Sequence, residues 1–209
     1  PGCPNWYGAQ RFGVAGDNAA RGRALLAAAA TGERRRGRGD GRRDRLLISA
    51  LQSELFNTYL RGRLEDGCYH QVLDGDVLQK RDSGGIFTST EPALDQPRLE
   101  LGEIAPTGPM FGHAMRAPPE GSAAAAREAA ILAAEGLTTT SFRAAGKLAQ
   151  GTRRAIGNDL GAVEVTLGGD AGRDAVDDTI WLSFTLPSGG YATAVMREIV
   201  KPPATDFPA

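Results

Sequence analysis

The chain carries two different hydrophobic periods, and these constrain its fold more than any other feature. Between Leu46 and Leu64, apolar residues recur at steps of three and four, which predicts one long helix with a broad buried face. Over 163–167 and 180–186 they alternate with polar residues, which predicts two half-buried antiparallel strands. Because both periods occur and no internal repeat is found, we assign the chain to the α+β class.

Shorter segments complete the predicted elements. Ser122 is a candidate N-cap for an alanine-rich helix that ends near Glu135, and Ser141 is a candidate N-cap for the next helix, with Arg153 and Arg154 beyond its end. We expect prolines to keep the middle of the chain irregular. The other predictions are a helix over 23–30, a strand-turn-strand over 72–78 with its turn at 74–76, a strand over 86–88, a helix over 191–200, and an irregular region around Pro92, Pro97, Pro106 and Pro109.

Composition excludes several classes of protein. The 209 residues are 41% hydrophobic and 23% charged, too apolar for wholesale disorder. No apolar run approaches the roughly 20 residues of a membrane span and no leader is recognised, so we expect neither membrane insertion nor export. Two cysteines, Cys3 and Cys68, are too few for a disulfide framework and favour a reducing, cytoplasmic location. A net charge of −1 means that local patches must bind any nucleic acid.

Glycine and aromatic residues are concentrated near the amino terminus. Trp6, Tyr7 and Phe12 fall within seven positions, next to Gly8 and Gly13. A loop built only for solubility does not need three aromatic rings, so this segment is a candidate for close backbone approach to a ligand. The sequence starts at a proline and not at methionine, so we expect either that a first portion is absent or that the start has been processed.

The segment from Pro4 to Gly13, PNWYGAQRFG, resembles the N-Y-F-G-x-Q-R-F-G signature of the TruD-type tRNA pseudouridine synthases. Further matches to this family follow in the same order and run nearly from end to end. They are Ser49-Ala50, Leu55-Phe56-Asn57, Asp74-Gly75-Asp76, Thr107-Gly108-Pro109, Leu186 to Thr193 (LPSGGYAT), and Arg197-Glu198.

The resemblance implies an enzyme that isomerises a uridine in tRNA to pseudouridine without cofactor or metal. Such chemistry requires the target base to leave its stack and enter a pocket. The implied fold is a partial pseudouridine synthase catalytic domain of antiparallel strands and helices, with a mixed α/β insertion domain. On this layout residues 1–30 and 157–209 belong to the catalytic domain and 31–156 to the insertion domain. We expect tRNA as the partner and favour a monomer.

The resemblance also implies site residues. Tyr7 would stack on the everted base, and Asn5 would position neighbouring polar groups. Ordinary alternatives stay open: Tyr191 is equally consistent with core burial, and the Arg197-Glu198 pair with a solvated helix face. Gln10 and Arg11 are equally consistent with a structural role, tying the loop to nearby backbone carbonyls. The predicted substrate-binding set is Asn5, Tyr7, Gln10, Arg11, Tyr191 and Arg197.

One departure from the family pattern limits the expected activity. The family's essential aspartate lies in a G-x-K-D motif upstream of the asparagine signature, and no such motif occurs in these residues. Asp17, Asp40 and Asp44 lie in the wrong context for that role. We therefore expect the nucleophile to lie outside this chain, which alone would not be a complete enzyme. The alternatives are a non-catalytic RNA-binding module that keeps the base pocket, and a generic α+β protein.

The remaining candidate site residues are arginines and possible metal ligands. The arginine-rich segment between positions 34 and 45 has no apolar period and predicts a mobile loop, either a solvated linker or a grip on tRNA phosphates. Arg153 and Arg154 are weaker candidates for the same role. Asp74 and Asp76 are better explained by a turn than by a cation site, and the cysteines and histidines lack zinc spacing, so we expect no metal. The predicted phosphate contacts are Arg34, Arg35, Arg36, Arg38, Arg42 and Arg43.

Overall fold

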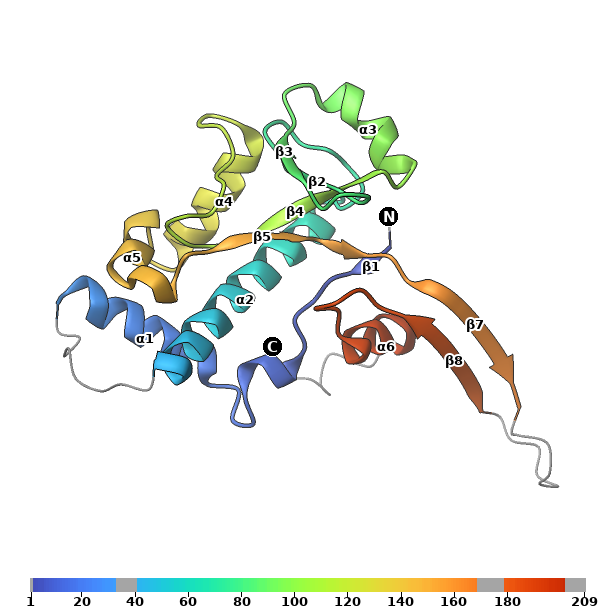
Figure 1. Cartoon of the computed structure of the whole chain (residues 1–209), viewed down its shortest axis with the longest axis horizontal. Helices are drawn as coiled ribbons and strands as arrows, with labels where there is room; N and C mark the ends of the chain where they lie inside the picture. The colour runs from blue at the N-terminus through green and yellow to red at the C-terminus, as the bar shows by residue number, and fades with distance from the viewer. Residues whose placement is uncertain (1, 33–40, 169–178, 202–209) are drawn as a thin grey trace.

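A computed structural model describes residues 2–32, 41–168 and 179–201. It has the expected α+β character, with helices and antiparallel strands. Strands β4 (Ile104–Met110) and β5 (Thr152–Ala155) run through the middle of the molecule, with helix α2 (Gly41–Glu65) along one side (Figure 1). Helix α1 (Asn18–Ala30) lies at one end in Figure 1, and a two-stranded ribbon of β7 (Gly161–Leu167) and β8 (Ile180–Thr185) extends from the other. No helix in the described part of the chain is long and apolar enough to cross a membrane.

Helix α2 (Gly41–Glu65) is the longest element and confirms the predicted period. Leu51, Leu55 and Phe56 on its inner face are fully buried. The helix begins one turn earlier than predicted, so Arg42 and Arg43 are helical, which corrects the loop prediction for this end of the arginine-rich segment. Arg34, Arg35, Arg36 and Arg38 lie outside the described residues.

Helix α1 (Asn18–Ala30) packs closely on α2. Gly22 makes this possible, because a Cβ there would lie 2.2 Å from the carbonyl oxygen of Leu47. The sequence predicted this helix only from position 23 onward. The extra first turn begins after Asp17, and Ala19 in that turn is buried.

A four-stranded antiparallel sheet has the order β3-β2-β4-β5. The prediction of an irregular middle is wrong, because Pro92 opens helix α3 and Pro106 and Pro109 lie inside β4. Strand β4 pairs with β2 over 104–106 and with β5 over 107–110, so each half has one ladder partner and a missing N–H is tolerated on the other side. The elements are β2 (Val77–Lys80), β3 (Ile86–Thr88), α3 (Pro92–Glu100), β4 (Ile104–Met110) and β5 (Thr152–Ala155).

The prediction over 72–78 is wrong in its first strand. The backbone turns between Leu73 and Asp76, and the Asp76 carboxylate accepts a hydrogen bond from the Leu73 N–H at 2.8 Å. Asp76 is fully buried because it pairs with the buried guanidinium of Arg63 at 2.9 Å. The predicted turn over 74–76 is therefore present and is held by that ion pair, but no strand directly precedes it, and β2 begins at Val77.

The two helices after the sheet are partly as predicted. Ser122 caps α4 (Ala123–Ala134) by accepting a hydrogen bond from the Ala125 N–H at 3.2 Å. Helix α5 (Thr139–Ala144) begins after Thr138 and not at Ser141, because the Ser141 hydroxyl accepts from the Thr138 N–H in a capping box. A short 3-10 turn, η2 (Gly146–Leu148), follows.

The amino- and carboxy-terminal segments meet beside this sheet. Strand β1 (Cys3–Pro4) pairs antiparallel with β6 (Gly157–Asn158), and a 3-10 turn, η1 (Ala9–Phe12), follows β1. Strands β7 (Gly161–Leu167) and β8 (Ile180–Thr185) pair as predicted, and α6 (Ala192–Val200) closes the described chain. Leu182 and Phe184 show the expected half-burial, whereas Val163 and Val165 on β7 are exposed.

Candidate functional site

Asn5 joins the signature segment to the strands that follow the sheet. Its side chain is buried, its Nδ2 donates to the Ala155 carbonyl at 2.9 Å, and its Oδ1 accepts from Asn158 Nδ2 at 2.7 Å and from Arg154 Nη2. The Asn5 N–H donates to the Ile156 carbonyl at 2.8 Å. The amide is therefore largely satisfied by protein, and its geometry suits the positioning role that the resemblance implies.

The backbone of Tyr7 is held from α2. Asn57 Oδ1 accepts from the Tyr7 N–H at 2.9 Å, and Asn57 Nδ2 donates to the Tyr7 carbonyl at 3.0 Å. This one side-chain amide thus bonds to the Tyr7 backbone as a neighbouring strand would. It fixes the position from which the Tyr7 side chain extends. Asn57 belongs to a block that matches the family, but the sequence alone gave it no role.

The Tyr7 ring lies half-buried among aromatic rings and guanidinium groups. The rings of Phe56 and Tyr191 meet it edge-on, with centroids 5.6 and 5.7 Å away. The guanidinium carbon of Arg154 lies 4.1 Å from its centroid, and that of Arg11 lies 5.5 Å away. These distances fall within the roughly 6 Å range of cation–π attraction. Because Arg154 covers one face of Tyr7, a stacked base needs the opposite face or the displacement of Arg154.

Arg154 is the residue of this site that sequence reasoning placed wrongly. It lies in β5 and not after a helix end, and consecutive strand residues point to opposite faces. Arg153 accordingly points to the buried carboxylate of Glu128 at 2.7 Å, while Arg154 points to Asn5 and Tyr7. Burial lowers the pKa of Arg154. The alternation of side chains along a strand would have shown that Arg153 and Arg154 point to opposite faces. The helix predicted over the preceding residues obscured this strand.

Arg11 reaches the same ring from η1. Its Nε donates to the Ser53 hydroxyl at 3.0 Å, and its Nη2 donates to the Ser49 hydroxyl. The two serines lie one turn apart on α2, so the helix fixes the position of the guanidinium. The contacts of Arg11 are to side-chain hydroxyls and not to the backbone carbonyls of the structural alternative. Gln10, beside it, is exposed.

The glycine turn before α6 brings Tyr191 to Tyr7. Gly189 has a φ of +88°, a conformation that favours glycine, and its carbonyl accepts from Arg154 Nη2 at 3.0 Å. Gly8 passes close to this turn, since a Cβ there would lie 3.6 Å from the Tyr191 ring. Tyr191 is half-buried, so it lies at the edge of the site and not in a core.

A hydrogen bond between Trp6 and Glu198 joins helix α6 to the signature segment. Trp6 Nε1 donates to Glu198 Oε1 at 2.6 Å. Arg197 is exposed on the same helix and lies apart from the ring contacts of Tyr7 that are described above. Burial and the Glu198 charge raise the pKa of the Cys3 thiol. Residues 3–7 and 191–198 therefore form one packed unit although 184 or more positions separate them in sequence.

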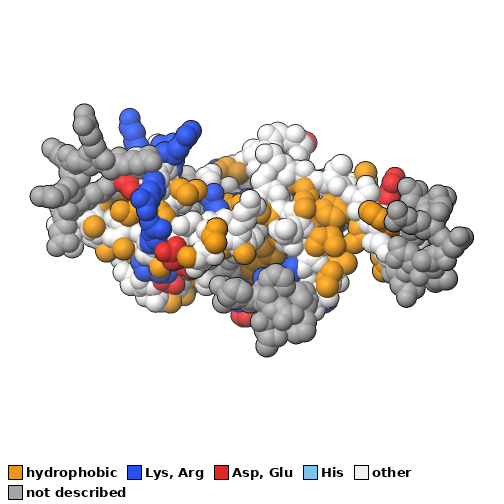
Figure 2. Space-filling view, turned by 90° about the horizontal axis from the view of Figure 1, so that it is seen from below, with side chains coloured by type: hydrophobic (Ala, Val, Ile, Leu, Met, Phe, Trp, Pro, Cys, Tyr) orange, Lys and Arg blue, Asp and Glu red, His pale blue; other side chains and the backbone are white. Residues whose placement is uncertain are grey.

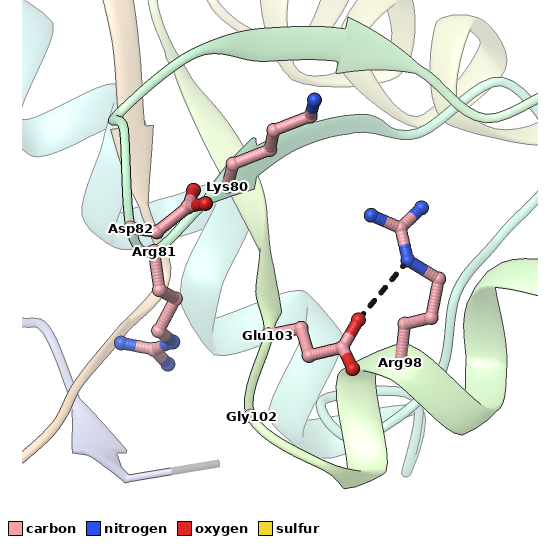
Figure 3. A pocket seen from close by; sticks show the side chains of 6 residues that line it. All are labelled: Lys80, Arg81, Asp82, Arg98, Gly102 and Glu103. Carbon is pink, nitrogen blue, oxygen red and sulfur yellow. Dashed lines mark hydrogen bonds and ion pairs between the residues drawn. The ribbon is translucent and has the colours of Figure 1, made fainter.

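Other candidates lie elsewhere. A hollow of about 360 Å³ between β2 and α3 is lined by charged side chains, and Figure 3 shows Glu103 turned toward Arg98 and Arg81 turned away from both. Three of the lining charges form ion pairs: Arg98 with Glu103 at 3.4 Å, and Arg81 with Asp159. A second hollow lies between α2 and α4. Tyr7 does not line either of these two hollows. Within the described residues, no group of three or more histidine, cysteine or acidic side chains is arranged to hold a metal ion.

Basic side chains also gather away from the ring. Arg42 and Arg43 are exposed in the first turn of α2. Figure 2 shows lysine and arginine side chains concentrated at the end of the molecule where α1 and α2 lie. This is where the predicted arginine-rich segment meets the described structure, so the basic surface and the Tyr7 site share helix α2.

A comparison with solved structures shows the fold. The fold matches a solved structure described as a putative tRNA pseudouridine synthase D from Methanosarcina mazei, with a TM-score of 0.75, 19% identity, and coverage of 99% of this chain and 62% of that chain. At this identity the match shows the fold alone, and this chain shares the fold of that solved structure.

Sequence comparisons then give the family. A family model described as tRNA pseudouridine synthase D (TruD) matches residues 41–199. A tRNA pseudouridine synthase D of Anaeromyxobacter dehalogenans is 47% identical over 204 residues, covering 96% of this chain and 54% of the relative. One from Thermus thermophilus is 38% identical over 205 residues, covering 98% and 52%. The chain belongs to the TruD family, and it spans about half the length of these curated relatives.

Proposed function

We propose that this chain is the base-holding and RNA-gripping part of a tRNA pseudouridine synthase, an enzyme that isomerises a uridine of tRNA. The isomerisation exchanges the N1–C1′ bond of uridine for a C5–C1′ bond, with the C5 proton replaced by one on N1, so nothing is added or lost. Membership of the TruD family supports the reaction class. The proposal includes tRNA as partner, a cytoplasmic location and a monomeric protein.

One observation carries the proposal. The half-buried ring of Tyr7 is surrounded by residues from distant parts of the chain: Asn57, 50 positions away, holds its backbone, and Tyr191, 184 positions away, lies at its edge. Asn5 organises the polar neighbours of the ring. Base stacking on an aromatic side chain contributes about 1–3 kcal/mol. A ring that only filled a core would not need two guanidinium groups beside it.

We propose the same division of the chain as before, with catalytic-domain segments at 1–30 and 157–209 and an insertion domain at 31–156. The pairing of β1 with β6 supports a shared unit for the two outer segments. On this proposal the nucleophilic aspartate lies outside these 209 residues. Arg34, Arg35, Arg36, Arg38, Arg42 and Arg43 are the proposed phosphate contacts, and Gln10 and Arg197 are proposed to face the substrate.

Photocrosslinking tests the pocket directly. A tRNA transcript carrying 5-bromouridine is irradiated with the chain, digested, and the attached peptides are identified by mass spectrometry. We expect attachment at residues 1–30 or 186–193, and its loss from the first segment in Tyr7→Ala. Attachment only at the hollow between β2 and α3, or unchanged attachment in Tyr7→Ala, contradicts the proposal.

Product analysis of the same transcript separates the incomplete enzyme from a complete one. We expect no pseudouridine from this chain alone, since the aspartate is proposed to lie outside it. Pseudouridine formed by these 209 residues would contradict that assignment. A chain that binds no tRNA at low salt would favour the generic α+β alternative instead.

A further inference from the structure

Arg11 and Arg154 differ from the other buried or half-buried arginines in what surrounds their charge. Within the described part of the chain, neither has a carboxylate at ion-pair distance. Two cations therefore lie at one aromatic ring without a neutralising acid. Seven other arginines do form ion pairs: Arg21, Arg23, Arg63, Arg81, Arg98, Arg127 and Arg153.

Neutral oxygens hold both guanidinium groups in place. Arg154 Nη2 donates to the carbonyls of Asn5 and Gly189 at 3.3 and 3.0 Å and to the Asn5 side chain. Arg11 is held by the hydroxyls of Ser49 and Ser53. Neutral acceptors fix the direction of a guanidinium and leave its positive charge uncompensated. The two groups are thus arranged before any ligand arrives.

Arg154 also has a donor without a partner. Its Nε is buried and makes no hydrogen bond, although a buried N–H ordinarily has an acceptor. The Nε atoms of Arg23 and Arg81 share this property, but those side chains are ion-paired through their other nitrogens. At Arg154, the Nε atom lacks an acceptor and the guanidinium group lacks a carboxylate partner among the described residues.

Electrostatics point in the same direction. Burial lowers the pKa of Arg154, and the phenol groups of Tyr7 and Tyr191 offset this only in part. The nearby charge of Arg11 makes a smaller contribution in the same direction as burial, because two like charges repel. An anion bound between the two guanidinium groups would relieve both the repulsion and the lost hydration.

We infer that Arg154 and Arg11 form a binding site for the phosphate group of the nucleotide whose base is held at Tyr7. This inference rests on the proposed base pocket. An everted base stays attached to its sugar and phosphates, so a ring that stacks the base has a phosphodiester within a few ångströms. Guanidinium forks match phosphate oxygens in charge and geometry, and a pair of them fixes the register of the strand.

The test uses the full chain and small probes, monitored by backbone amide NMR shifts at low salt. The probes are uridine, uridine 5′- and 3′-monophosphate, inorganic phosphate, and acetate. We expect at least one uridine monophosphate to bind about tenfold more tightly than uridine, an advantage of the size of one charge-assisted hydrogen bond. This advantage should shrink as salt rises.

Three variants separate the site from general charge. Arg154→Met and Arg11→Met should each remove most of the tenfold advantage while uridine itself still binds, and Arg154→Lys should restore only part of it. Arg143→Met is the matched control, since Arg143 is exposed on α5, and it should change nothing. If Arg154→Met does not fold, as judged by its amide spectrum, Arg11→Met and the wild-type probe series decide alone.

The other outcomes are distinct. Equal binding of uridine and its monophosphates overturns the phosphate site and leaves the base pocket standing. Acetate binding more tightly than inorganic phosphate also overturns it, and assigns the two arginines to a protein carboxylate. Phosphate-dependent binding that persists in both methionine variants overturns it as well. A chain that binds none of the five probes overturns the phosphate site and the base pocket together.

Discussion

Asn57 holds the backbone of Tyr7 through both ends of its side-chain amide, at 2.9 Å to the N–H and 3.0 Å to the carbonyl. We expect Asn57→Ala to lower the free energy of unfolding by about 1–2 kcal/mol, because two hydrogen bonds are lost and their backbone partners are only half-buried. Asn57→Asp keeps the acceptor and loses the donor at neutral pH. Urea unfolding should show the aspartate variant's deficit shrinking at acidic pH, where the protonated acid donates again; a deficit independent of pH would contradict the two-ended contact.

Gly22 and Gly62 offer a matched pair of helical glycines. A Cβ at Gly22 would meet the backbone of Leu47 at 2.2 Å, whereas one at Gly62 would meet only the end of the flexible Arg127 side chain at 3.2 Å. We therefore expect Gly22→Ala to destabilise the protein by about 3 kcal/mol through overpacking. Gly62→Ala should stabilise it by roughly 0.5–1 kcal/mol, as alanine does in a helix interior. Denaturant midpoints measure both, and equal shifts would show that α1 does not depend on close approach to α2.

The ion pair of Arg153 and Glu128 is almost fully buried, with side chains 2% and 7% exposed. Burial raises the pKa of Glu128 even though Arg153 lies 2.7 Å away and lowers it. Arg153→Met leaves an uncompensated buried carboxylate and should cost about 3–5 kcal/mol. The double variant Arg153→Met/Glu128→Leu should cost less than the sum of the single changes. Additive losses in this double-mutant cycle would mean that the two side chains act independently.

Tyr59 predicts how stability changes at alkaline pH. Burial raises its pKa to about 12, with the carboxylates of Asp76 and Glu128 adding to this and Arg63 opposing it. The folded state then holds the phenol proton more tightly than the unfolded chain, whose tyrosine ionises near 10. The contribution of Tyr59 is constant below pH 10 and is lost as pH rises toward 12, by about 3 kcal/mol.

Comparison with Tyr59→Phe isolates this effect from the other tyrosines. The phenylalanine variant loses the hydroxyl that accepts from Arg63 Nη1 at 3.2 Å, so it should be less stable at pH 8. Its stability should then fall less steeply than that of the wild type between pH 10 and 11.5. Two parallel stability curves would show that Tyr59 does not ionise late.

The proposed tRNA phosphate contacts make a separate prediction. Replacing Arg34, Arg35 and Arg36 with serine, or Arg42 and Arg43 with serine, should flatten the dependence of tRNA affinity on salt, by about one unit of slope for each lost phosphate contact. Tyr7→Ala should leave that slope unchanged, because one stacked base is a small part of a phosphate-dominated interface. Filter binding at four salt concentrations measures both. An unchanged slope in the arginine variants would leave that segment as a linker.

Local sequence predicted several elements. Helix α2 follows from its apolar spacing, and helix α4 follows from its Ser122 cap and alanine-rich sequence. The β7–β8 pair follows from alternation, although Val163 and Val165 on β7 are exposed. The errors fall where a single side chain overrides the local pattern. The predicted turn over 74–76 is present, but the strand expected before it is not, and the carboxylate of Asp76 instead pairs in the core with Arg63, thirteen residues earlier. Pro106 and Pro109 enter a strand because each half of β4 pairs on one side only.

Only the residues in segments that resemble the family were predicted to belong to the candidate site. Tyr7, Asn5 and Tyr191 were chosen from a resemblance, and the structure brings them together. Arg154 and Asn57 were not predicted to lie at Tyr7, since nothing local shows that position 154 faces position 7 or that position 57 reaches the same backbone. Such pairs depend on tertiary packing, which hydrophobic spacing does not encode.

Contacts such as Asn5 with Ala155 and Trp6 with Glu198 join positions 150 and 192 residues apart. Closing loops of this length is entropically costly, so contacts of this kind form after the local helices during folding. The cluster of side chains around Tyr7 would consequently be the last part of the molecule to assemble and the first to be lost on partial unfolding. A proteolytic fragment that keeps α1 to α5 intact would retain most of the helices but not the complete cluster.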